Sequence, residues 1–175
     1  EISFEYDGKY RPLVHFTAAK GWINDPNGLV YANGKYLMYF QHNPVATTWE
    51  NMHWGGAFSE DLIHWREFGD VLFPDKDGTM FSGCAIIDKD NRCGFQQDDT
   101  PVILYYYTSA GHTSETSKHK PFTQCLAYST DGGKTLIKYG KNPIIENLAY
   151  ENRDPKVIYY SPLDIYIMVL YLDGH

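Results

Sequence analysis

The chain has 175 residues, 43% hydrophobic and 21% charged, which is the composition of a globular protein able to bury a core. Its net charge of −7 and its single short basic cluster, residues 117–120, argue against nucleic acid, whose phosphates require clustered Lys and Arg. No stretch reaches transmembrane length, so no membrane partner is expected.

In chain order, β-rich segments follow one another and no window of ten residues predicts an amphipathic helix. The strongest signal is a hairpin over residues 29–41, because Asn33-Gly34 favours a tight turn between strands. Residues 59–65 form at most one helical turn. The other predicted strands and hairpins are residues 52–68, 81–88, 101–108, 126–139 with a bend at 130–133, and 157–172 with a turn at 161–164. The chain is therefore predicted to be all-β.

Cysteine and histidine patterns give no metal or disulfide signal. Cys84, Cys93 and Cys125 are odd in number and lack CxxC spacing, which predicts small buried apolar residues. The seven histidines form no HExxH-like pair, so we expect neither metal nor cofactor. Because the chain opens on Glu1 rather than Met, we expect that an upstream segment was removed, and the compartment is not readable from this start. Among the alternatives, a secreted or periplasmic location is favoured.

A degenerate repeat organises the strands. Three times a small polar cluster leads into an apolar strand, a turn and a second apolar strand, with starts near Asp25, Ser82 and Asp154. Further strand–turn–strand segments follow the first two starts, so the unit has four antiparallel strands. Such a repeat predicts a β-propeller, in which the first strand of each blade lines a central channel. A β-sandwich is the alternative, and it would leave Asp25 and Asp154 unrelated.

Asp25 and Asp154 share a local pattern, since each precedes a proline. Proline biases the preceding residue toward extended backbone, so we expect it to fix the direction of each carboxylate. Arg153 is expected to keep the Asp154 carboxylate ionised and oriented. Two ordinary Asp-Pro turns are the alternative for either residue alone, but recurrence at matching places in the repeat favours a shared site.

Paired carboxylates in an aromatic surrounding are what glycoside hydrolysis requires. Aromatic residues make up 16% of the chain; sheet packing explains most of them, and some can stack on sugar rings. Trp65 is interpreted as core. The aromatic candidates near the motifs are Trp22, Trp49, Trp54 and Phe81, and the candidate hydroxyl partners are Asn24, Gln41 and Ser82.

These residues carry a family resemblance. The segment GWINDPNGLVY, residues 21–31, resembles the W-M-N-D-P-N-G motif of glycoside hydrolase family 32, the invertase, inulinase and levanase family. Other segments resemble the family in the family's order, and together they cover essentially the whole chain. They are YFQHNP (39–44), MHWGGAFSEDLIHW (52–65), FSGCAIID (81–88), QCLAYSTDGGKT (124–135) and NRDPKV (152–157).

The resemblance implies a five-bladed β-propeller, of which residues 1–175 are the incomplete N-terminal portion, roughly two and a half blades. It implies a retaining hydrolase of β-fructofuranosides, closer to the inulinase and levanase branch, with a fructose-containing oligo- or polysaccharide as partner. Asp25 matches the nucleophile, and Asp154 matches the acid that stabilises the transition state by binding sugar hydroxyls. The positions that match the fructose subsite are Asn24, Gln41, Trp49, Phe81, Ser82 and Arg153.

The chain departs from the family pattern at several places. Ile23 replaces Met, a tolerated packing swap, while Cys84 replaces Ser and Gly56 replaces His, which we expect to alter the polar lining of the pocket. The family's acid/base is a Glu in a downstream E-C motif, but no Glu follows Glu151 in this sequence. We therefore expect the isolated chain to be inactive, and its open propeller to self-associate.

Two alternatives have different functions. A carbohydrate-binding module would keep the pocket and lack the acid/base. An inverting hydrolase on a similar propeller also places acids at the starts of blades, but it fits the sequence from WINDPNG to RDPK poorly. The residues that follow His175 in the gene separate the first alternative from a hydrolase.

Overall fold

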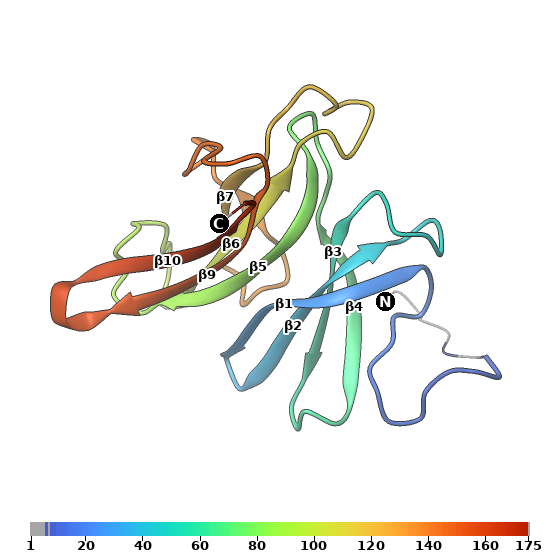
Figure 1. Cartoon of the computed structure of the whole chain (residues 1–175). Helices are drawn as coiled ribbons and strands as arrows, with labels where there is room; N and C mark the ends of the chain where they lie inside the picture. The colour runs from blue at the N-terminus through green and yellow to red at the C-terminus, as the bar shows by residue number, and fades with distance from the viewer. Residues whose placement is uncertain (1–5, 7, 175) are drawn as a thin grey trace.

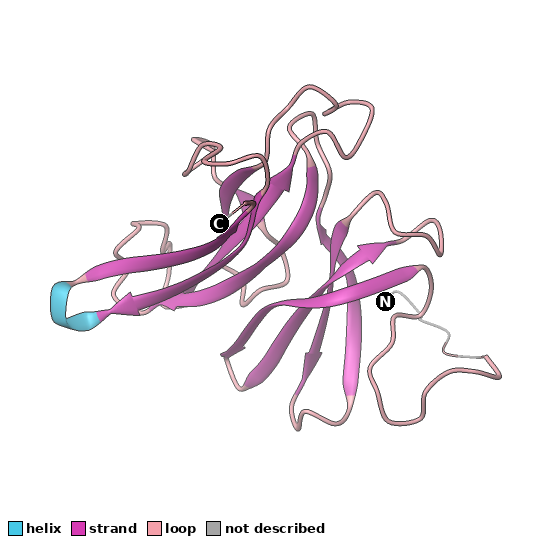
Figure 2. Ribbon diagram, viewed as in Figure 1, coloured by secondary structure: helices cyan, strands magenta, loops and turns pink. Residues whose placement is uncertain are grey.

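The computed structural model describes residues 6 and 8–174, and these residues fold into antiparallel sheets (Figures 1 and 2). The one helical segment within these residues is the 3-10 turn η1, Ser161–Leu163. The all-β prediction is confirmed. The strands are β1 (Trp22–Ala32), β2 (Lys35–Asn43), β3 (His53–Ser59), β4 (Trp65–Leu72), β5 (Thr79–Asp88), β6 (Val102–Ala110), β7 (Thr123–Ser129), β8 (Ile137–Lys138), β9 (Asn152–Tyr160) and β10 (Ile165–Leu172).

The strands form two four-stranded sheets and a hairpin. β1-β2-β3-β4 is the first sheet, β5-β6-β7-β8 is the second, and β9 pairs with β10. Every neighbouring pair is antiparallel and consecutive in sequence, which is the meander of propeller blades. Residues 6 and 8–174 include no helix long and apolar enough to span a membrane.

The predicted hairpins are present, and their turns explain the residues used. Asn33 and Gly34 connect β1 to β2 with φ of 52° and 76°, the left-handed values that a tight hairpin turn requires. Gly132 and Gly133 also have positive φ in the β7–β8 connection. Residues 60–64 form an irregular loop rather than a helical turn, because the Ser59 and Asp61 side chains accept hydrogen bonds from its backbone amides.

Aromatic residues fill the space between the first two blades. Tyr39, Trp54 and Tyr105 are almost fully buried there, as expected for residues that serve sheet packing. The Tyr39 and Tyr105 hydroxyls lie 2.7 Å apart, and the Tyr39 hydroxyl donates to the Gly133 carbonyl oxygen at 2.7 Å. The buried hydroxyls therefore satisfy one another, and they tie β2 to β6 and to the β7–β8 turn.

A second core joins the second blade to the β9–β10 hairpin. Leu104, Leu126 and Val157 are buried in it, and the Cys84 thiol accepts a hydrogen bond from the Val157 amide at 3.1 Å. Cys84 and Cys125 are buried as predicted, whereas Cys93 is half-buried; all three are free thiols. Burial raises the pKa of Cys125 to about 11, so it stays a neutral thiol at physiological pH.

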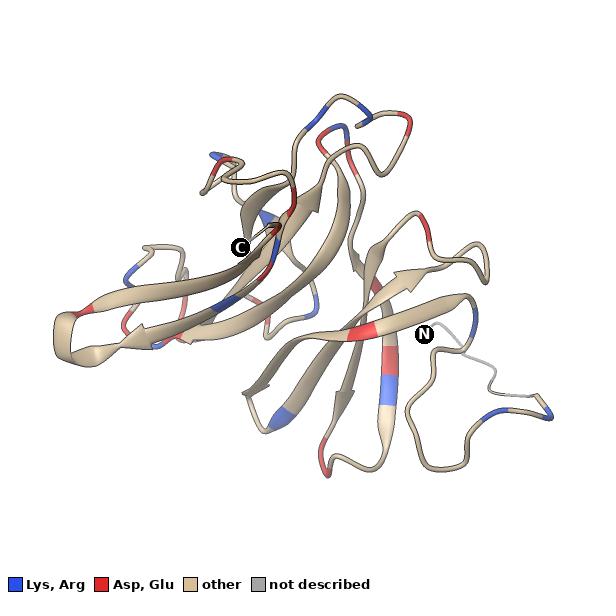
Figure 3. Cartoon of the chain, in the orientation of Figure 1, with Lys and Arg blue, Asp and Glu red and all other residues tan. Residues whose placement is uncertain are grey.

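The first strands of successive units lie side by side. β1 contacts β5, and β5 contacts β9, so the three strands line the inner side of the arrangement (Figure 1). This is the blade order of a propeller, and the sandwich alternative does not apply. Loops 44–52, 73–78, 111–122 and 139–151 gather on one side of the molecule, where β5 and β9 begin. Charged residues lie mostly in the loops, although β1, β4 and β9 also contain carboxylates (Figure 3).

Candidate functional site

Each of the three channel strands contains a β-bulge at a predicted site residue. Asn24 and Asp25 of β1 together face one residue of β2, and Phe81 and Ser82 of β5 face one residue of β6. In β9, Asp154 and its proline face one residue of β10. A bulge adds one residue to a strand and re-aims its side chains. The bulges in β1 and β9 thus explain why Asn-Asp-Pro and Asp-Pro occur inside strands rather than in hairpin turns.

One cavity of about 300 Å³ collects side chains from all three bulges. Asp25, Ser82 and Asp154 line it, although they are far apart in sequence and come from three units of the fold. The other lining residues are Pro26, Asn27, Gly28, Leu29, Gly83, Cys84, Pro155 and Lys156. The pairing of two acids at one cavity is the arrangement that the blade repeat predicts.

Asp25 is oriented by the neighbouring blade. The Ser82 hydroxyl donates a hydrogen bond to Asp25 Oδ2 at 2.8 Å, joining β5 to β1 beside the cavity. Two residues further along β1, Asn27 Oδ1 accepts the Gly83 amide at 3.2 Å. The two contacts fix the register of β1 against β5. The Asp25 carboxylate is therefore held in a defined direction.

Asn27 is a site residue that sequence reasoning missed. Its side chain is 1% exposed, and its Nδ2 has no hydrogen-bond partner within residues 6 and 8–174. Asn beside Gly is an ordinary turn signal, so the sequence pattern gave no reason to expect burial. Lys156, which also lines the cavity, was missed as well; like Asp154, it is an exposed residue of β9.

Asp154 departs from the predicted geometry. Its φ is 57°, in the left-handed region, whereas the following proline predicted extended backbone. The bulge explains the difference, because the extra residue of β9 must turn out of the ladder. Burial raises the pKa of Asp154, Arg153 opposes that effect, and the Asp25 carboxylate adds to the rise. Burial is the larger effect on this pKa, and the expectation that Arg153 keeps Asp154 ionised and oriented stays a prediction.

Arg153 is engaged mainly elsewhere. Its Nη1 contacts Glu151 Oε2, and its guanidinium lies 4.2 Å from the centroid of the Tyr171 ring. Its Nε is 3.6 Å from Asp154 Oδ2, a longer contact than a direct hydrogen bond of good geometry. Arg153 thus divides its charge between two carboxylates, which explains its weak hold on Asp154.

The remaining predicted subsite residues surround the cavity without lining it. Gln41 is 2% exposed and its amide donates to the Met80 carbonyl oxygen at 2.8 Å, so it fixes the start of β5. Asn24 Oδ1 accepts a hydrogen bond from Trp22 Nε1 at 2.8 Å. The rings of Trp49 and Phe81 meet edge to face, with centroids 5.8 Å apart. Direct contact of these residues with fructose stays a prediction.

Two tryptophans belong to the cores. Trp54 is fully buried, and its Nε1 donates to the Phe81 carbonyl oxygen at 3.0 Å, so it is not available to stack on a sugar. Trp65 is half-buried beside Phe16, as predicted for a core residue. Because Trp54 anchors the backbone next to Ser82, its contribution to the site is positional.

The departures from the family pattern have structural explanations. Ile23 packs in the cluster around Phe40 and Ala57, which fits a packing swap. Gly56 lies away from the cavity: a Cβ there would come within 2.4 Å of the Phe68 ring. The expectation that Gly56 alters the polar lining is therefore wrong, because large aromatic residues occupy that space. Cys84 does line the cavity, with its thiol directed to β9.

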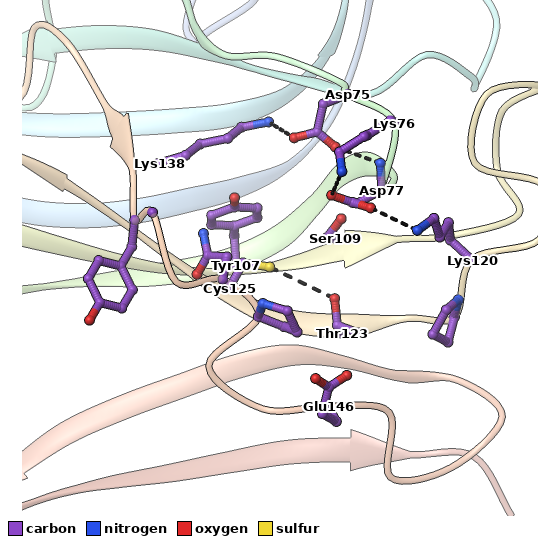
Figure 4. Close-up of a pocket in the computed structure, with 15 residues that line it drawn as sticks. Asp75, Lys76, Asp77, Tyr107, Ser109, Lys120, Thr123, Cys125, Lys138 and Glu146 are labelled. Carbon is purple, nitrogen blue, oxygen red and sulfur yellow. Dashed lines mark hydrogen bonds and ion pairs between the residues drawn. The ribbon is translucent and has the colours of Figure 1, made fainter.

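Two cavities of about 510 Å³ are larger, and the one shown in Figure 4, called the larger cavity below, lies between β4–β5, β6–β7 and the segment after β8. Two of its three carboxylates are neutralised by lysines, since Asp75 pairs with Lys138 at 2.6 Å and Asp77 with Lys120 at 3.3 Å. A carboxylate whose charge is neutralised by a lysine is a poor nucleophile, so this cavity is the weaker catalytic candidate. Within the described chain, no group of three His, Cys, Asp or Glu residues is suited to hold a metal.

Comparisons with known sequences give the same family throughout. Residues 15–173 match the model described as the glycosyl hydrolases family 32 N-terminal domain. The levanase of Bacillus subtilis (strain 168) is 42% identical over 167 residues, which make up 94% of this chain and 24% of the levanase. Invertase 1 of Saccharomyces cerevisiae is 41% identical, over 90% of this chain and 30% of the invertase. The chain thus spans a quarter to a third of the length of these relatives.

Solved structures share the fold. The exo-inulinase from Aspergillus awamori superposes with a TM-score of 0.84 at 36% identity, covering 95% of this chain and 36% of the inulinase. The β-fructofuranosidase from Schwanniomyces occidentalis, solved with fructosyl-erythritol, gives 0.82 at 38% identity, covering 91% of this chain and 31% of that enzyme. From the family match, these relatives and the propeller arrangement of its sheets, the chain belongs to glycosyl hydrolase family 32.

Proposed function

We propose that residues 1–175 are the N-terminal portion of a single β-propeller catalytic domain that hydrolyses terminal β-D-fructofuranosyl bonds with retention of configuration. The observation that supports this most is the convergence of Asp25, Ser82 and Asp154 on one cavity from three bulged strands. Family membership supplies the class of reaction. The substrate is a fructose-containing oligo- or polysaccharide.

Asp25 is the proposed nucleophile. One of its oxygens attacks the anomeric carbon of the fructosyl unit while the bond to the leaving oxygen breaks, which gives a covalent fructosyl–enzyme ester. Water then cleaves the ester and restores the free carboxylate. Ser82, which donates to Asp25 Oδ2 at 2.8 Å, leaves the other oxygen for the attack. Positioning of this kind lowers the entropic part of the barrier.

Asp154 is proposed to accept hydrogen bonds from sugar hydroxyls. Burial disfavours its charged form, so hydroxyl donors that replace lost solvent stabilise the carboxylate. These hydrogen bonds strengthen as positive charge develops on the sugar ring, which directs binding energy to the transition state. Asp154 thereby complements the nucleophile without reacting itself.

The acid/base that protonates the leaving oxygen is proposed to come from outside residues 1–175. Glu146 lines the other cavity, and Glu151 contacts the Arg153 guanidinium. Neither lines the cavity of Asp25 and Asp154. A retaining glycosidase needs two carboxyls roughly 5 Å apart on either side of the bond, so a Glu from a further blade would complete the pair.

The family relatives indicate the substrate class. The relatives with the named activities are a levanase, invertases and exo-inulinases, and one related structure holds fructosyl-erythritol. We infer a fructan or sucrose-type substrate for the protein that contains this chain.

The test is hydrolysis of sucrose, inulin and levan by the full-length protein and by its Asp25→Asn variant. We expect the full-length protein to release fructose, and Asp25→Asn to abolish turnover while substrate still binds. The amide keeps the shape of the side chain but removes the nucleophile. Retained turnover in Asp25→Asn would remove Asp25 from its role.

A carbohydrate-binding role is the second candidate. It is favoured by one observation: within the described chain, no glutamate lines the cavity. The two candidates separate on the same assay, because a binding module retains affinity for a fructo-oligosaccharide but releases no fructose. The isolated 175-residue chain is expected to behave in this second way, and turnover at a rate typical of a complete enzyme would contradict it.

A further inference from the structure

Three aromatic rings form a stack near the candidate site. The His112 ring lies between Phe122, with centroids 4.9 Å apart and planes at 26°, and Tyr150, with centroids 5.9 Å apart and planes at 25°. Phe122 is buried, whereas Tyr150 is 73% exposed. The stack therefore runs from the core to the surface and presents the Tyr150 ring to solvent.

A continuous row of rings connects this stack to the cavity. Phe122 meets Phe81 edge to face at 5.4 Å, and Phe81 meets Trp49 at 5.8 Å. Phe81 shares its bulge with Ser82, whose hydroxyl contacts Asp25. Apart from Phe81, which lies in β5, the rings come from loops 44–52, 111–122 and 139–151, which gather on one side of the molecule (Figure 1).

The backbone at His112 is held in an unfavourable conformation. Its φ is 46°, in the left-handed region that usually takes glycine, and its amide donates to the Ser117 carbonyl oxygen at 2.7 Å. Its Nδ1 donates to the Lys120 carbonyl oxygen at 3.2 Å, which leaves Nε2 as the hydrogen-bond acceptor of the neutral ring. Strain of this kind persists where the position of a side chain matters.

Hydrogen bonds also hold the loop that carries Tyr150 against the segment that contains Phe122. Asn147 Nδ2 donates to the Phe122 carbonyl oxygen at 2.9 Å and to Asn152 Oδ1 at 2.8 Å. The Leu148 amide donates to the same Asn152 oxygen at 3.0 Å. Hydrogen bonds thus hold both loops in place, so a ligand that stacks there loses little affinity to loop ordering.

We propose that Tyr150, supported by His112, forms an outer subsite that binds a fructosyl unit of a longer fructan, remote from the unit held at Asp25. The inference rests on the proposed function. A sugar ring offers an apolar C–H face to the Tyr150 ring and a hydroxyl donor to His112 Nε2. Lys120, in the same loop as His112, forms an ion pair with Asp77 across the larger cavity at 3.3 Å. Its charge is therefore already paired, which suits a neutral ligand.

The test measures binding by calorimetry in the full-length Asp25→Asn protein, which binds without turnover. The ligands are sucrose and an inulin-type pentasaccharide, and the variants are Tyr150→Ala and Tyr150→Phe. We expect Tyr150→Ala to weaken pentasaccharide binding about three- to tenfold more than sucrose binding, because only the longer chain reaches the ring. Tyr150→Phe keeps the ring face and is expected to restore most of the affinity.

Tyr10→Ala is the matched control, since Tyr10 is 88% exposed in the segment before β1. It is expected to change neither affinity. Equal losses for both ligands in Tyr150→Ala, or no loss, would overturn the subsite. Failure of the parent to bind the pentasaccharide would overturn it as well.

The same proteins separate the subsite from the proposed function. Hydrolysis by the protein with Asp25 intact, together with a Tyr150→Ala that shows no length-dependent loss, removes the subsite and leaves the function. No hydrolysis, together with a length-dependent loss, supports the subsite as a binding feature and removes the function.

Discussion

At the residue scale, the site depends on hydrogen bonds across blades. Asp25 belongs to the first blade, but the Ser82 hydroxyl that orients it belongs to the second. Gln41 also helps to position Ser82, because its buried amide donates a hydrogen bond to the Met80 carbonyl oxygen just before the Phe81–Ser82 bulge. The Asp25 carboxylate is thus positioned by residues that the sequence places tens of positions away.

Ser82→Ala tests this positioning. Loss of a hydrogen bond to a charged group costs about 1.5–3 kcal/mol, so kcat of the full-length protein is expected to fall roughly 10- to 100-fold. KM for sucrose should change much less if the hydroxyl orients Asp25 rather than holding substrate. Steady-state kinetics give both values, and an unchanged kcat would show that the Ser82–Asp25 hydrogen bond has no catalytic effect.

Asp154→Asn tests the charge state. The pKa of Asp154 is raised above the ordinary 3.8, so its ionised form is disfavoured in the folded protein. The neutral Asp154 carboxyl therefore stabilises the folded state relative to the unfolded state. This stabilisation is present below pH 3.8 and is lost as the pH rises through the folded pKa. Asp154→Asn should therefore raise Tm at pH 7 and lose this advantage near pH 3.8.

The comparison is thermal unfolding of the full-length protein at both pH values. Asp99→Asn, at an exposed loop position, is the charge-matched control. A Tm for Asp154→Asn that lies below the parent at pH 7 would show that the carboxylate is stabilising there.

At the element scale, β1 has two bulges, and Gly28 belongs to the second of them. Its φ is +54°, and a Cβ there would lie 2.8 Å from Tyr39 Cδ2 and 3.2 Å from the Trp54 ring. Gly34 also has positive φ, at +76°, but a Cβ there meets nothing within 4 Å. A comparison of substitutions at the two glycines therefore separates the energetic cost of backbone strain from the cost of steric overlap.

Gly28→Ala is expected to destabilise the protein by about 2–4 kcal/mol, which adds overpacking to left-handed strain. Gly34→Ala should cost only the strain, about 1–2 kcal/mol. Urea unfolding of both variants measures the difference. Equal losses would mean that the Tyr39 and Trp54 rings move aside without cost.

The strands follow from local patterns, but the bulges do not. Asn33-Gly34 specifies its hairpin by turn chemistry, and the apolar runs around it specify strands. The bulge at Asp154 depends on pairing with β10 and on contact with β5, which no local pattern encodes. For this reason the extended backbone predicted before Pro155 was wrong. The burial of Gln41 and of Asn27 depends on the same long-range contacts.

At the scale of the whole molecule, the β9–β10 hairpin is apolar on both faces. Tyr166 and Met168 pack against the second core, whereas Ile165, Ile167 and Val169 on the alternate face are 37–61% exposed. A strand with two apolar faces is typical of a sheet covered on both sides. A further blade is the proposed cover, and the isolated chain leaves this face open.

The isolated chain is therefore expected to self-associate, and Val169→Lys should reduce the association by placing a charge on that face. Val45→Lys is the control, because Val45 is exposed in the β2–β3 loop. Light scattering over a concentration series gives the mass. A monomeric parent chain at all concentrations would contradict the open-face explanation.

The most direct measurement is the position of the covalent intermediate. The full-length protein is mixed with β-fructofuranosyl fluoride, whose leaving group needs no proton, and turnover is stopped by denaturing acid. Peptide mass spectrometry then locates the sugar. We expect one fructosyl group esterified to Asp25, in the peptide that contains Asn24-Asp25-Pro26. Turnover with the fructosyl group on another residue, or with none on the protein, would contradict it.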